Sequence, residues 1–149
     1  MMYLRLLALS ALCFVTSPIW SFTCIYTLVK DNCWTDYDVT VDVIEDSTSK
    51  TLLTVTAPKG KSWARGTFNC EAAEGLRYVA QFSPVFWQND VGKTYPALRN
   101  WYLPAKVNPG DLAWTIPVCF PADFAQVPFP PNVAGNCKCN FKNIPDPKL

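Results

Sequence analysis

The chain has 149 residues, with 13 lysines and arginines, 12 aspartates and glutamates and no histidine, which gives a formal net charge of +1. This near-neutral balance argues against nucleic acid or an anionic membrane surface as a partner, because such binding normally requires a basic excess. The absence of histidine excludes the Ser-His-Asp and Cys-His arrangements of nucleophilic catalysis.

Residues 1–21 have the pattern of a secretory signal peptide. Arg5 precedes an apolar stretch at residues 6–15, and Pro18 separates that stretch from Ser21. The stretch is about half as long as the roughly 20 residues that a membrane-spanning helix needs. We therefore expect cleavage after Ser21, loss of Cys13 with the signal, and an exported mature protein, periplasmic or secreted, with no membrane span.

The cysteines that follow the signal predict a disulfide framework. They are even in number: Cys24, Cys33, Cys70, Cys119, Cys137 and Cys139. In an exported domain of this size, we expect three disulfides. A Cys137–Cys139 bond is disfavoured, because its ring would close across a single residue. The spacing leaves the other pairings open, and among them we favour Cys24 with Cys33, and Cys70 and Cys119 with the two tail cysteines.

Two chemical interpretations of the cysteines remain as alternatives to a structural role. Cys137 and Cys139 could form a thiol-exchange site, but the chain has no C-x-x-C motif beside a βαβ pattern. A zinc site is disfavoured by the lack of histidine and by the oxidising compartment that export implies. We therefore expect no metal and no cofactor.

Between the cysteines, apolar and polar residues alternate over short stretches, which is typical of β-strands with one wet face. No stretch has the apolar periodicity of a long helix. We expect strands at residues 37–44, 51–57, 62–70, 76–87, 95–103 and 112–118. About six or seven short strands predict an all-β domain over residues 22–120, either a compact antiparallel β-sandwich or a small barrel.

Residues 121–149 are rich in proline, with Phe124, Val127 and Phe129 between the prolines. Such a composition favours extended backbone. We expect a proline-rich C-terminal strap that packs on the domain and is tied by disulfides. The alternative is a segment that docks on a partner.

Catalysis has little support in the remaining residues. A carboxylate pair is the one catalytic arrangement still open, and Asp38 and Asp42 share a strand face. Alternating carboxylates on a strand are typical of its solvent side. We therefore expect binding rather than enzymatic activity.

Aromatic side chains supply the candidate binding residues. Five of the six tryptophans follow residue 21, and exposed tryptophans anchor protein interfaces or stack on sugar rings. Our candidates are Trp63, Arg65, Trp101, Tyr102 and Phe129. We expect a non-enzymatic exported binding or structural protein that acts on a protein partner. The alternative is a carbohydrate-binding or carbohydrate-active secreted protein.

Overall fold

A computed structural model describes residues 21–133 and 135–149, so the predicted signal segment lies outside the described residues apart from Ser21. The elements are β1 (Phe22–Lys30), the short 3-10 helix η1 (Asn32–Trp34), β2 (Asp38–Glu45), β3 (Thr51–Ala57), β4 (Trp63–Cys70), β5 (Gly75–Ser83), the 3-10 helix η2 (Gln88–Asp90), β6 (Tyr95–Pro96), β7 (Trp101–Tyr102) and β8 (Trp114–Phe120). The described residues include no helix with the length and apolar character needed to cross a membrane.

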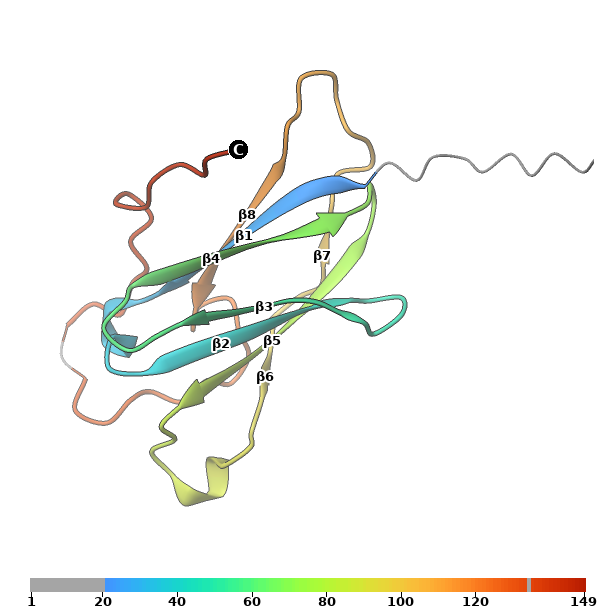
Figure 1. The fold of residues 1–149 in the computed structure, drawn as a ribbon. Coiled ribbons are helices and arrows are strands. Elements are labelled where there is room, and N and C mark those ends of the chain that lie inside the picture. Colours follow the sequence, from blue (N-terminus) through green and yellow to red (C-terminus); the bar gives the residue numbers. More distant parts are fainter. Residues whose placement is uncertain (1–20, 134) are drawn as a thin grey trace, which may run out of the picture.

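The strands form two sheets that pack face to face, as Figure 1 shows. One sheet has the order β4-β1-β8, and the other has the order β3-β2-β5-β6, with β7 beside β5. The predicted all-β sandwich is therefore confirmed. Its pairing departs from the antiparallel expectation at β1 and β8, which are parallel because the chain enters both strands from the same end of the sheet.

The core lies between the sheets and is built by alternating residues of each strand. β2 buries Val39, Val41 and Val43 in it, as the alternation in residues 37–44 predicts. Trp34 closes one end of the core, with its ring 4.7 Å from the ring of Phe82 and 4.8 Å from that of Phe120.

Two of the expected strands are shorter than predicted. The strand expected at residues 76–87 ends at Ser83, because Pro84 has no backbone N–H for a further ladder bond. The strand expected at residues 95–103 is reduced to the two-residue strands β6 and β7, and the chain between them turns. This shortening leaves one side of the sandwich only partly covered.

The central strand β1 does not appear in the sequence prediction. It buries both faces: alternate residues enter the core, whereas Ile25 and Val29 are buried on the opposite face. C-terminal residues cover that outer face, since Cys139 Sγ lies 3.4 Å from Val29 O, and an Arg65 guanidinium nitrogen donates to Pro145 O at 2.9 Å. A strand without a wet face gives no alternation, so its pattern was missed.

The six cysteines form three disulfides, Cys24–Cys70, Cys33–Cys137 and Cys119–Cys139. The predicted Cys24–Cys33 bond is wrong, because Cys24 in β1 lies opposite Phe68 of β4, two residues from Cys70. The predicted bond between Cys70 and the tail is wrong for the same reason. The bond from Cys119 to a tail cysteine is confirmed.

Three disulfides fit a protein that folds in an oxidising compartment. Two of them join the C-terminal segment to the body of the domain. The proline-rich strap expected over residues 121–149 stays a prediction.

Candidate functional site

The β3–β4 side of the sandwich is tightly closed. A Cβ added at Gly66 of β4 would lie 3.0 Å from both methyl carbons of Leu53 and 3.2 Å from a methyl carbon of Val55, both in β3. Only a glycine fits at this distance without displacing its neighbours. The two sheets therefore meet here with no space for a ligand.

The opposite side of the sandwich is closed at one end by the chain that follows β8. Ala125 N donates to Pro96 O at 2.8 Å, and Leu98 N donates to Asp123 O at 2.9 Å. These bonds place Phe124 in the core, with its ring 5.6 Å from the ring of Phe120. The segment thus fills the space beside β6.

The other end of this side, between β7 and the start of β8, holds a pocket of about 350 Å³. We call it the β7–β8 pocket. Its lining consists of Tyr78 of β5, residues 101–104 and residues 113–117, and it contains no charged side chain. Two of the predicted binding residues, Trp101 and Tyr102, lie here, and Trp114 joins them from the other sheet. The pocket therefore offers mostly apolar and aromatic surface.

The rim of the pocket is aromatic. Tyr102, which lines the pocket, is 72% exposed. A large side chain that remains this exposed beside an apolar pocket makes this surface a candidate for interaction.

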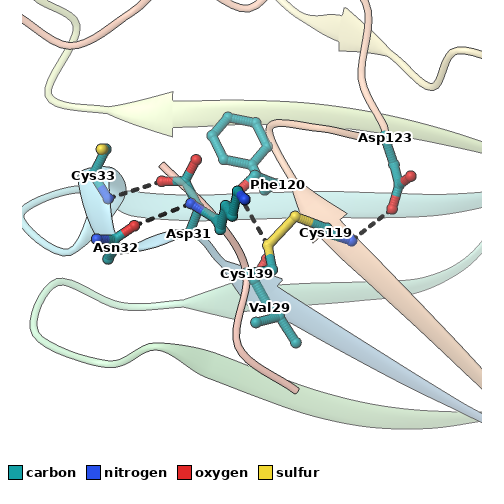
Figure 2. Close-up of a disulfide and its surroundings, with 9 residues drawn as sticks. Val29, Asp31, Asn32, Cys33, Cys119, Phe120, Asp123 and Cys139 are labelled. Carbon is teal, nitrogen blue, oxygen red and sulfur yellow. Dashed lines mark hydrogen bonds between the residues drawn. A yellow bond between two sulfur atoms is a disulfide. The ribbon is translucent and has the colours of Figure 1, made fainter. Parts of the chain in front are cut away.

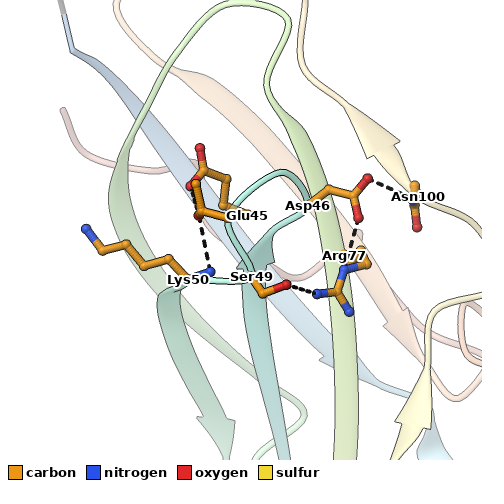
Figure 3. A network of polar contacts seen from close by, with 7 residues as sticks. Glu45, Asp46, Ser49, Lys50, Arg77 and Asn100 are labelled. Carbon is orange, nitrogen blue, oxygen red and sulfur yellow. Dashed lines mark hydrogen bonds and ion pairs between the residues drawn. The ribbon is translucent and has the colours of Figure 1, made fainter.

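A polar network fixes the segment that enters β7 (Figure 3). Asp46 accepts a hydrogen bond from Asn100 Nδ2 at 3.2 Å and pairs with Arg77 Nε at 3.0 Å. Gly75 lies opposite Tyr102, and a Cβ there would be 3.2 Å from the Tyr102 ring. The position of Tyr102 at the rim is thus set by contacts from both β5 and the loop after β2.

The free edge of β8 is poorly suited to accept a further strand. Cys119 N donates to Asp123 Oδ2 at 2.7 Å, so this edge N–H is already used (Figure 2). Pro117, two residues earlier on the same side of the strand, has no N–H to offer. Natural sheets protect their edges in this way. This edge therefore offers no free backbone N–H at Pro117 or Cys119.

Some polar atoms near the pocket are shielded from solvent. Tyr78 Oη and Trp101 Nε1 are buried and make no hydrogen bond within the described part of the chain. Burial also raises the pKa of Tyr78, with a smaller contribution from the charge of Asp123. Because water does not reach these atoms, the pocket presents their rings rather than their polar groups.

Trp63 and Arg65 lie elsewhere, on the outer face of β4. The Arg65 guanidinium is 5.1 Å from the Trp63 ring centre, and its Nε donates to Thr27 Oγ1 at 2.9 Å. A second guanidinium nitrogen donates to Pro145 O. Their visible contacts join the C-terminal segment to the sheet, and a binding role for them stays a prediction.

Trp63 also lines a more polar pocket of about 280 Å³ beside η1 and the tail. The buried Lys30 has its Nζ engaged with Tyr37 O at 2.6 Å and Pro58 O at 2.9 Å, and burial lowers its pKa. Asp31 accepts from Cys33 N at 2.8 Å, and burial raises its pKa. Both side chains therefore make hydrogen bonds to backbone groups of the protein.

The same region brings Asp31, Cys33 and Cys137 within metal-binding distance of one another. The two sulfur atoms are bonded to each other, so neither is a thiolate that could hold a metal. The carboxylates considered for catalysis are likewise in local contacts: Asp42 Oδ1 accepts from Thr54 Oγ1, and Asp38 Oδ1 accepts from Lys59 N.

The structure thus separates the five predicted binding residues into three places. Trp101 and Tyr102 lie at the β7–β8 pocket, Trp63 and Arg65 lie at the tail, and Phe129 is 77% exposed in the proline-rich segment. Sequence reasoning missed Trp114 as a pocket residue, because its alternation in β8 indicates only that it belongs to a strand.

Comparison with known proteins adds no relative to this description. No family model matches the chain, and no curated protein and no solved structure matches it.

Proposed function

We propose that this protein is an exported, non-enzymatic binding protein that takes a protein partner at the β7–β8 pocket. The observation that supports this best is the lining of the pocket, which has two tryptophans, two tyrosines and no charged side chain. The centres of protein interfaces are enriched in these aromatic residues and depleted of charge. The exposed ring of Tyr102 extends the same character outward.

The export that this proposal requires rests on the sequence of residues 1–21 and is consistent with three disulfides. The mature protein would act in the periplasm or outside the cell. No cofactor is needed for the proposed role.

Carbohydrate binding has weaker support. The guanidinium of Arg99 lies 4.6 Å from the Trp101 ring centre, and that of Arg65 lies 5.1 Å from the Trp63 ring centre. One face of the Trp101 ring and one face of the Trp63 ring are therefore already covered. A sugar also needs several polar partners, and the lining of the β7–β8 pocket is largely apolar.

The test compares recovery of associated proteins from the exported fraction by wild type, Tyr102→Arg and Val91→Arg. Val91 is 70% exposed in the loop after β5, so it matches Tyr102 in exposure but lies away from the pocket. We expect one protein to be recovered by wild type and Val91→Arg and to fall by about tenfold or more with Tyr102→Arg, because a charge must be desolvated in an apolar contact.

Equal recovery by all three proteins would contradict the proposal. Titration with an oligosaccharide panel, followed by tryptophan fluorescence, gives the second readout. A saturable response that is lost in Tyr102→Arg would replace the protein partner by a sugar.

A further inference from the structure

The protein carries both an apolar pocket and an exposed apolar projection that suits it. We propose that the β7–β8 pocket receives the proline-rich segment at residues 127–131 of a second copy of this chain, with Phe129 as the inserted side chain. This inference rests on the proposed function, because it uses the same pocket and names its occupant.

Phe129 is the projecting side chain. At 77% exposed, it is the most exposed of the large hydrophobic residues in the described part of the chain. Its flanks are held: Pro130 is buried, Pro128 is half-buried, and Val127 packs against the core. Each proline fixes its own φ, so little backbone freedom remains to be lost when the segment docks.

The pocket has the chemistry that such a segment requires. Proline-rich segments bind in grooves lined by aromatic side chains. Here Trp101, Tyr102 and Trp114 supply the aromatic lining. Residues 127–131 are uncharged, as is the lining, so no ionised group has to be buried on contact. A volume of about 350 Å³ is within the range of pockets that enclose a ligand group.

Within one copy, the two features stay apart. Ala125 is tied to Pro96 beside β6, and Phe129 is absent from the residues that line the β7–β8 pocket. Each molecule therefore presents one projection and one pocket, both free to meet another copy. Because the projection and the pocket are different surfaces, copies join either head to tail, in a ring or an open chain, or as a two-fold dimer in which each copy inserts its Phe129 into the other's pocket.

The experiment measures the mass of the disulfide-bonded protein by sedimentation over a concentration series. Wild type is compared with Phe129→Ser, which removes the projection, and with Tyr102→Arg, which blocks the pocket. Both substituted residues are exposed, so circular dichroism and the unfolding midpoint should remain those of wild type. We expect wild type to associate with concentration and each variant to associate at least about thirtyfold more weakly, as loss of a main interface anchor implies.

An equimolar mixture of the two variants gives the sharpest result. Phe129→Ser still has its pocket, and Tyr102→Arg still has its projection, so the mixture contains one functional contact per pair. We expect it to form dimers and nothing larger. A synthetic peptide with the sequence of residues 125–132 should also bind Phe129→Ser saturably by tryptophan fluorescence, whereas the same peptide with serine in place of phenylalanine should not.

A wild-type protein that stays monomeric at every concentration, or Phe129→Ser that associates as strongly as wild type, would overturn the inference. In either case, recovery of a partner that depends on Tyr102 would leave the proposed function standing with another protein as occupant. If the protein neither associates with itself nor recovers a partner that depends on Tyr102, the proposed binding function is contradicted as well.

Discussion

On the β3–β4 side of the sandwich, the sheets approach until only a glycine fits between them, whereas on the β7–β8 side they leave a pocket of about 350 Å³. Long strands run the length of the first side. On the second side, β6 and β7 have two residues each, and the chain after β8 fills only the space beside β6. The β7–β8 pocket is therefore a consequence of the shortness of two strands.

Removal of the Phe124 side chain, which fills the space beside β6, should have the largest effect on stability. Phe124→Ala would extend the opening along the whole side, and we expect it to lower the free energy of unfolding by about 3–5 kcal/mol, the usual cost of emptying a buried phenylalanine site. Phe129→Ala is the matched control, because that phenylalanine is exposed and should change stability by less than about 0.5 kcal/mol. Urea unfolding measures the free energy of unfolding of both variants. Equal losses would contradict the placement of Phe124 in the core and of Phe129 on the surface.

Loss of the Cys33–Cys137 disulfide, which joins the C-terminal segment to η1, should have the next largest effect on stability. Cys33→Ala with Cys137→Ala removes a bond that joins residues 104 apart in the sequence, and native disulfides of small exported domains stabilise by about 2–5 kcal/mol. We expect a loss in this range by urea unfolding. Proteolysis should then cut first between residues 121 and 137. First cleavage within β2 or β5 would show that this bond does not hold the segment.

The closed side can be tested by adding volume to it. Gly66→Val places methyl groups against Leu53 and Val55, and overpacking of this kind costs about 1–3 kcal/mol. The measurement is again the free energy of unfolding. An unchanged value would mean that β3 and β4 separate easily, and the contrast between the two sides would fail.

Added side-chain volume on the β7–β8 side should have the smallest effect on stability. Ala113→Val adds methyl groups to the wall of the β7–β8 pocket, where free space accepts them, so stability should change by less than about 0.5 kcal/mol. Binding of the peptide of residues 125–132 should nevertheless weaken. A loss of stability comparable to that of Gly66→Val would show that the pocket is occupied by the protein itself.

Sequence patterns predicted the strands with one wet face. Residues 51–57 are an example, since Pro58 ends the alternation where β3 ends. The strand β1 could not be found in this way, because its outer face is covered by residues more than one hundred positions later. Once β1 is missed, the Cys24–Cys70 pairing is hidden as well, since it follows from the register of β1 with β4.

Only part of the candidate site could be predicted from the sequence. Trp101 and Tyr102 are adjacent aromatic residues directly after Arg99 and Asn100, so aromatic composition singled them out. Trp114 and Trp101 line the same pocket only because the two sheets pack together, and no local pattern in the sequence indicates this. For Trp63 and Arg65, the tail at Pro145 is equally remote in sequence.

The parallel pairing of β1 with β8 has a consequence for how the chain is made. Synthesis begins at the N-terminus, so β1 emerges early. Its second neighbour, β8, emerges only after most of the domain. Until then, β1 presents an apolar strand with one unpaired backbone edge, and such edges promote aggregation. Chains that end before Trp114 should therefore be far less soluble than the whole protein, and a factor that binds unfolded chains would protect them.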